Sequence, residues 1–141
     1  MLTTVEKVLL LQDVDIFEHT STEDLSYIAA IAEEIECQTD DVIYKEDEIS
    51  DSMYAVIEGK VRLTRGEKEV MVAGKMEAFG TWALFDDEPR VATATALEAS
   101  QLLRIDKEEF IDLLADHVAI TQSILKTMAK RLRRLITRIY K

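Results

Sequence analysis

The sequence predicts an α+β protein in which an eight-stranded antiparallel β-roll, similar to a double-stranded jelly roll, lies between an N-terminal helix and C-terminal helices. Short runs rich in β-branched and aromatic residues follow one another over residues 35–106. A spacing of about 8–12 residues between such runs is typical of strands in a sandwich or barrel. On both sides of this segment, apolar residues recur every three or four positions, which indicates amphipathic helices.

Capping signatures place the helices. Hydroxyl and acidic residues at 20–24 precede an apolar stripe at helical spacing, which predicts a helix that ends near Glu34. Asp106, with an acid three residues later, predicts the start of the next helix. A long helix is expected from about Val118, and a short helix or turn over residues 4–12.

The 141 residues fit one domain. We divide it into an N-terminal helical part at 1–34, a β-roll at 35–106 and C-terminal helices at 107–141. Gly59 and Gly66 fall where hairpin turns are expected.

Charge is distributed unevenly along the chain. The net charge is −11, yet the last sixteen residues hold seven basic residues and no acidic one. Residues 1–125 therefore carry 10 basic against 28 acidic residues. This body repels nucleic acid and anionic membranes, whereas the basic tail attracts anions.

A cytoplasmic location is predicted from the single cysteine and from the absence of targeting segments. Cys37 has no partner for an internal disulfide, which fits a reducing compartment. The apolar run near the N-terminus is short and has acidic flanks, unlike a signal peptide. No stretch approaches 18 continuous apolar residues, so no transmembrane segment is expected.

No catalytic or metal-binding constellation stands out, so an enzyme is not expected. A metal site in a β-roll needs paired histidines and a carboxylate on the strands. His19 and His117 lie outside the strand series instead. Nucleophile-elbow, P-loop and paired acid–base patterns are also missing.

A candidate anion site lies in residues 79–96, FGTWALFDDEPRVATATA. A helical turn that opens at Gly80 offers unpaired N–H groups, and glycine allows an anion to approach the backbone. Arg90 supplies a permanently charged, forked donor, and Pro89 fixes its approach. From composition alone, Arg90 could instead pair with the acidic residues at 86–88.

This segment resembles the phosphate-binding cassette of the cyclic-nucleotide-binding domain family, whose pattern is Phe-Gly-Glu-x-Ala-Leu, a variable loop and Pro-Arg-x-Ala. The resemblance extends to SDSMYAVIEGKVRL, which is similar to the central hairpin of the family, and to LLRIDKEEFIDLL, which is similar to its last strand and following helix. It implies a regulatory or sensor module that binds a cyclic nucleotide, cAMP rather than cGMP, and needs no further cofactor.

The resemblance also implies roles for individual residues. Arg90 would bind the exocyclic phosphate oxygens, and nearby backbone amides would line the same phosphate. The amides are those of Ala83, Leu84, Val91 and Ala92, and the predicted site is completed by Phe79, Gly80, Thr81 and Trp82.

Three departures from the family pattern support an alternative. Thr81 stands where the family has a glutamate that binds the ribose hydroxyl, Met76 replaces a common glycine, and Trp82 introduces an indole that stacks on a ligand or packs into the protein. A charge-assisted hydrogen bond contributes about 1.5–3 kcal/mol, so its loss weakens binding about ten- to a hundredfold. The alternative function is a degenerate, ligand-free β-roll that acts as an interaction or dimerisation module.

The basic C-terminal helix is expected to mediate contacts. Its apolar stripe fits a homodimer seam, a cover over the ligand or a membrane-surface helix. Transcription factors of the family carry a DNA-binding domain after this helix, and no such domain is predicted within residues 1–141. The chain could equally be a regulatory part of a larger protein.

Overall fold

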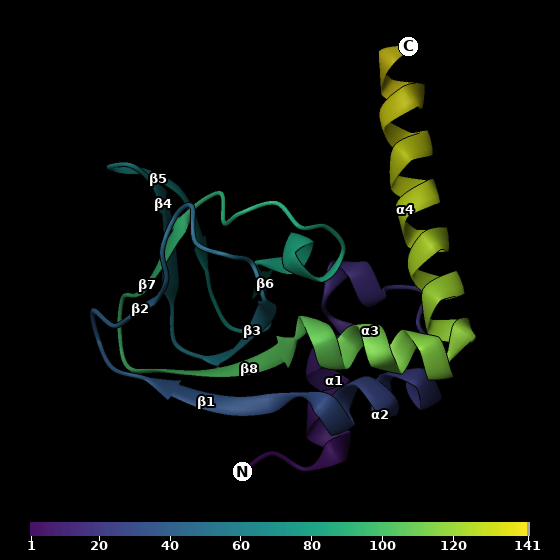
Figure 1. The fold of residues 1–141 in the computed structure, drawn as a ribbon, viewed down its shortest axis with the longest axis horizontal. Helices are drawn as coiled ribbons and strands as arrows, with labels where there is room; N and C mark the ends of the chain where they lie inside the picture. Colours follow the sequence, from purple (N-terminus) through teal and green to yellow (C-terminus); the bar gives the residue numbers. More distant parts are fainter. Residues whose placement is uncertain (141) are drawn as a thin grey trace.

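Two four-stranded antiparallel sheets form the β-roll in the computed structural model, which describes residues 1–140 (Figure 1). Their strand orders are β1-β8-β3-β6 and β2-β7-β4-β5. This arrangement confirms the predicted fold class. The strands are β1 (Glu33–Cys37), β2 (Val42–Tyr44), β3 (Ser52–Glu58), β4 (Val61–Arg65), β5 (Lys68–Ala73), β6 (Ala78–Phe79), β7 (Thr93–Ala96) and β8 (Ser100–Asp106).

The helices that precede and follow the roll in the sequence gather on one side of it, and a short helix interrupts the strand series (Figure 1). The α-helices are α1 (Thr4–Gln12), α2 (Thr22–Ile31), α3 (Lys107–Asp116) and α4 (Val118–Ile139), and the 3₁₀ helices are η1 (Asp15–Phe17) and η2 (Thr81–Leu84). The predicted caps form, because the side chains of Ser21 and Asp106 accept hydrogen bonds from backbone amides of the first turns of α2 and α3.

The boundary between α2 and the roll differs from the prediction. The helix ends at Ile31, and β1 already begins at Glu33. Glu33 and Glu34 pair with Arg104 and Leu103 of β8. The backbone ladder with β8 therefore overrides the helical periodicity that suggested an end near Glu34.

Two buried clusters meet at η2. One joins α1, α2, α3 and the base of α4 to the adjacent sheet, and it includes Phe17, Phe110 and Leu84. The other fills the roll and includes Tyr54 and Phe79. Because Leu84 belongs to the helical cluster while η2 borders the roll interior, the cassette connects both cores.

Left-handed backbone conformations occur where the sequence analysis placed turns. Gly59 and Gly66 have φ angles of 107° and 61° in the two predicted hairpin turns. Met76, just before the cassette, also has a positive φ of 71°. Only glycine adopts this region without steric cost, which explains physically why glycine suits position 76.

The helix α4 packs on the body through its first half only. Ile120, Ile124 and Thr127 are buried, whereas the residues from Leu132 onward are exposed. Figure 1 shows the second half projecting away from the body. Within residues 1–140, no helix is both long and apolar enough to cross a membrane.

Candidate ligand-binding site

A cavity of about 740 Å³ opens in the roll beside η2 and the loop that precedes β7. Its volume falls within the range of about 300–1,000 Å³ that is typical of small-molecule sites. Side chains and backbone from both sheets surround it. The lining residues are Tyr44, Ser50, Leu63, Arg65, Val70, Met71, Ala78, Phe79, Gly80, Thr81, Trp82, Ala83, Asp86, Glu88, Pro89, Arg90, Val91 and Ala92.

Arg90 points into the roll and is only 4% exposed. Its Nη2 donates to Ser52 Oγ at 3.2 Å and lies 3.6 Å from the Asp51 carboxylate. Its Nε–H has no hydrogen-bond partner among residues 1–140. Because buried donors are nearly always satisfied, this unpaired donor on a cavity-lining arginine points to an acceptor that the chain itself does not supply.

The acidic loop at 86–88 does not hold Arg90, so the alternative of a local ion pair is wrong. Asp87 instead pairs with Lys107 at 2.6 Å, and the backbone carbonyl of Asp86 accepts from the same ammonium at 2.6 Å. Lys107 also lowers the pKa of the Asp87 carboxyl by donating a hydrogen bond to it. The loop is thereby tied to the start of α3.

An aromatic cluster packs against the Arg90 guanidinium. The ring centroid of Tyr44 lies 3.8 Å from the guanidinium carbon, which is a cation–π contact. Tyr54 and Phe79 pack beside Tyr44, with ring centroids 6.0 and 6.1 Å away. Burial raises the pKa of the Tyr44 hydroxyl to about 12, so it stays neutral at physiological pH.

Gly80 makes room for Arg90. It caps η2 with a φ of 71°, and a Cβ at this position would lie 2.8 Å from Arg90 Nη1 and 3.3 Å from the Tyr44 hydroxyl. A side chain at position 80 would therefore displace the guanidinium.

We expect Gly80→Ala to lower the melting temperature by more than about 3–7 °C and to abolish binding of the cyclic nucleotide that the cassette resemblance implies. The positive φ alone costs about 1–2 kcal/mol, which corresponds to that shift for a domain of this size. Gly66→Ala is the matched control, because Gly66 has a φ of 61° and no atom within 4 Å of an added Cβ. Calorimetric melting and titration of both variants check this. Equal effects of the two variants on binding would contradict the assigned role.

All but one of the predicted site residues line the cavity. The exception is Leu84, which is buried in the helical cluster and anchors η2. The amide of Ala83 already donates to the carbonyl of Gly80 at 3.2 Å. The binding roles of these residues stay predictions.

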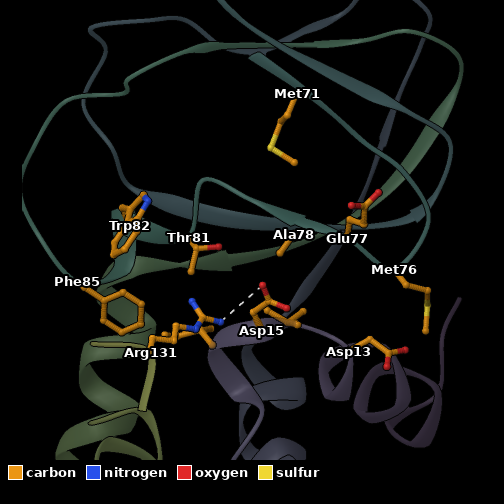
Figure 2. Close-up of a pocket in the computed structure, with 12 residues that line it drawn as sticks. Asp13, Asp15, Met71, Met76, Glu77, Ala78, Thr81, Trp82, Phe85 and Arg131 are labelled. Carbon is orange, nitrogen blue, oxygen red and sulfur yellow. Dashed lines mark ion pairs between the residues drawn. The ribbon is translucent and has the colours of Figure 1, made fainter. Parts of the chain in front are cut away.

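Thr81 and Trp82 separate two cavities. The second cavity, of about 300 Å³, lies between the cassette, η1 and α4, and Figure 2 shows Thr81 and Trp82 on one wall with Arg131 below them. Arg131 pairs there with Asp15 at 3.6 Å. Trp82 is 67% exposed, so the interpretation that its indole packs into the protein is wrong.

Three residues that contact Arg90 were missed by the sequence analysis. Tyr44 ends β2, and Asp51 and Ser52 lie at the start of β3, about forty residues before Arg90 in the chain. Asp51 also lies 3.8 Å from Arg104 of β8, and its backbone carbonyl accepts from the amide of Lys107 at 2.8 Å. No alternating pattern in β2 (VIY) or β3 (SMYAVIE) indicated that these side chains face Arg90.

The fold and the site together define a β-roll in which a buried arginine lines an internal cavity. Residues 34–117 match the family model described as "Cyclic nucleotide-binding domain". The chain therefore belongs to the cyclic nucleotide-binding domain family, and it is a regulatory domain of that family.

Individual relatives agree with this assignment. The chain is 30% identical to the CRP-like cAMP-activated global transcriptional regulator of Mycobacterium tuberculosis over 97 residues. The aligned segment covers 65% of this chain and 43% of the relative. The crystal structure of the N-terminal domain of a transcriptional regulator from Streptomyces coelicolor is similar with a TM-score of 0.85 and 28% identity, covering 92% of this chain and 94% of that one.

An enzyme also appears among the relatives. Lysophospholipase nte1 of Aspergillus fumigatus is 29% identical over 119 residues, which cover 81% of this chain but 8% of the relative. The match to nte1 is therefore confined to a small part of that protein. The chain also spans less than half the length of the curated transcriptional regulators that it matches.

Proposed function

We propose that this domain binds a cyclic nucleotide in the larger cavity, cAMP in preference to cGMP, and that it acts as a non-catalytic sensor in the cytoplasm. The observation that carries the proposal is the buried Arg90 guanidinium, whose Nε–H has no partner among residues 1–140. A phosphate oxygen there would complete its hydrogen bonds. Two relatives support the preference for cAMP: the cAMP-activated regulator of Mycobacterium tuberculosis and the cyclic AMP receptor protein of Thermus thermophilus, which is 30% identical over 96 residues.

The rest of the ligand would extend from Arg90 along the apolar side of the cavity. Leu63, Val70 and Met71 lie on that side, and Trp82 stands at its edge. An exposed indole in this place is suited to stack on a purine. Thr81 offers a hydroxyl in place of a carboxylate to the ribose, so we expect weaker binding than a glutamate would give.

The alternative, a ligand-free interaction module, rests on Thr81, Met76 and Trp82. A filled pocket would favour it. The cavity beside Arg90 is open, and Trp82 is turned toward solvent rather than into it. The sensor is therefore the better-supported function.

Isothermal titration with cAMP and cGMP up to millimolar concentration tests the proposal. We expect binding of both, tighter for cAMP. The absence of heat with either nucleotide would favour the ligand-free module. Native mass spectrometry of the purified protein would in addition reveal any other anion that co-purifies with it and could occupy the site at Arg90.

Ligand binding would be transmitted to the helices through Asp51 and Lys107. Asp51 contacts Arg90 by its carboxylate and the first residue of α3 by its backbone carbonyl. Lys107 holds the cassette loop through Asp87. A phosphate at the Nε–H would compete with the Asp51 carboxylate for the charge of Arg90 and weaken their ion pair, and α3 and α4 would move relative to the roll.

We further propose that α4 forms a homodimer seam. Its exposed apolar residues follow one another at spacings of seven, three and four, which fit the a and d positions of a coiled coil. The basic residues of the helix, at 126, 130, 131, 133, 134 and 138, fall outside the seam positions. The exposed seam residues are Leu125 (59%), Leu132 (59%), Leu135 (54%) and Ile139 (77%).

Leu132→Lys is expected to weaken this dimer at least about a hundredfold. Two buried leucines are lost per dimer, at about 1.5–3 kcal/mol each, and two charges enter the seam. Sedimentation equilibrium of the variant, compared with Lys130→Gln outside the seam, measures the effect. A protein that is monomeric at 100 μM before any substitution would contradict the seam.

A further inference from the structure

One face of the Arg90 guanidinium is covered by the ring of Tyr44. The ring belongs to β2, is 8% exposed, and has its centroid 3.8 Å from Cζ of Arg90. The contact is made by the face of the ring rather than by its hydroxyl. An aromatic face attracts a cation electrostatically and also fixes the plane of a flat guanidinium.

The other sides of the guanidinium are also defined. Gly80 leaves just enough space at Nη1, since a Cβ there would lie 2.8 Å away. Ser52 and Asp51 occupy the Nη2 side at 3.2 and 3.6 Å. With these contacts and the ring in place, the buried Nε–H still has no hydrogen-bond partner among residues 1–140.

The Tyr44 ring is itself held in place. Tyr54 and Phe79 pack against it, and they stack on each other at 5.3 Å. Its partner across the sheet is Ala94 of β7, a small residue that is fully buried. Because the ring is wedged among these neighbours, it supports Arg90 in one orientation rather than following its motion.

We propose that Tyr44 is a positioning residue of the site: its π face holds the Arg90 guanidinium in the plane in which the Nε–H is presented to an anion. This proposal deepens the proposed function and rests on it, because the anion is taken to be the nucleotide phosphate. The contribution comes from the electron-rich ring, so phenylalanine at position 44 retains it and an electron-poor ring of the same shape loses it.

Replacing Tyr44 by phenylalanine and then by its mono-, di- and trifluorinated analogues tests the proposal without changing the packing volume appreciably. Fluorination withdraws electron density from the ring face and weakens the cation–π attraction in steps. We expect Tyr44→Phe to bind cAMP within about threefold of the unaltered protein. Across the fluorinated series the affinity should fall about threefold to thirtyfold in total, while the melting temperature stays nearly constant.

A second measurement separates this proposal from the proposed function. The NMR signal of the Arg90 Nε–H, recorded without ligand, should exchange with water progressively faster along the fluorinated series as the guanidinium loosens. An unchanged exchange rate across the series would overturn the positioning role whether or not cAMP binds. If the unaltered protein binds no cyclic nucleotide but the exchange rate rises, the sensor function fails and the support of Arg90 by Tyr44 stands. A flat affinity series in a protein that binds cAMP would also overturn the proposal.

Discussion

Arg90→Gln is expected to reduce the affinity for cAMP about a hundredfold or more. Truncating one partner of a buried, charge-assisted contact costs about 2–5 kcal/mol, because the phosphate is left in the cavity without its counter-charge. The effect should be large here, since the only other cation that lines the cavity within residues 1–140, Arg65, is exposed at a hairpin end. Isothermal titration gives the affinity.

Arg65→Gln is the matched control for this substitution. It removes the same charge from the lining of the same cavity, but Arg65 lies at the end of β4 and is exposed. We expect its effect on cAMP affinity to stay below about threefold, as is usual for a solvent-screened charge. Similar losses in the two variants would show that general electrostatic attraction, rather than a contact with Arg90, governs binding.

The stability of the Arg90 variant needs a separate measurement. Arg90→Gln removes the donor to Ser52 Oγ and one cation near Asp51, but Asp51 still accepts from Ser52 Oγ at 2.9 Å, remains near Arg104 and is itself exposed. The melting temperature of the ligand-free protein should therefore change by only a few degrees. A folded variant that does not bind cAMP would assign the loss to the missing contact.

The sequence predicted the cassette well because the cassette is a local structure. Gly80, the short helical turn and Arg90 lie within a dozen residues, and their spacing determines how they meet. The roll was predicted for a similar reason, since strand runs and hairpin glycines are local signals. The missed end of α2 shows the limit, because its boundary depends on pairing with β8, which lies about seventy residues further along the chain.

The surroundings of Arg90 could not be predicted in the same way. Tyr44 reaches it from β2, and Asp51 and Ser52 reach it from the start of β3. These contacts depend on how the two sheets close on each other, which no short-range pattern specifies. Local reasoning instead suggested that the acidic loop would pair with Arg90, whereas Lys107 engages that loop.

Thr81→Glu is expected to tighten cAMP binding about ten- to a hundredfold. Thr81 lies at the start of η2 on the wall of the larger cavity, in the position of the family's ribose-binding glutamate. A carboxylate there would accept a hydrogen bond from the ribose hydroxyl, worth about 1.5–3 kcal/mol. Isothermal titration of this variant and of Thr81→Gln, which has the same size without the charge, measures the gain.

The position of Arg131 limits how large this gain can be. Thr81 also faces the second cavity, where Arg131 forms an ion pair with Asp15 (Figure 2). A carboxylate at position 81 could turn toward Arg131 instead of the ribose, so Thr81→Glu combined with Arg131→Gln should bind cAMP at least as tightly as Thr81→Glu alone. Unchanged affinity in both variants would mean that the ribose does not reach η2, whereas no detectable binding in either variant would make the ligand-free interaction module the better account of this domain.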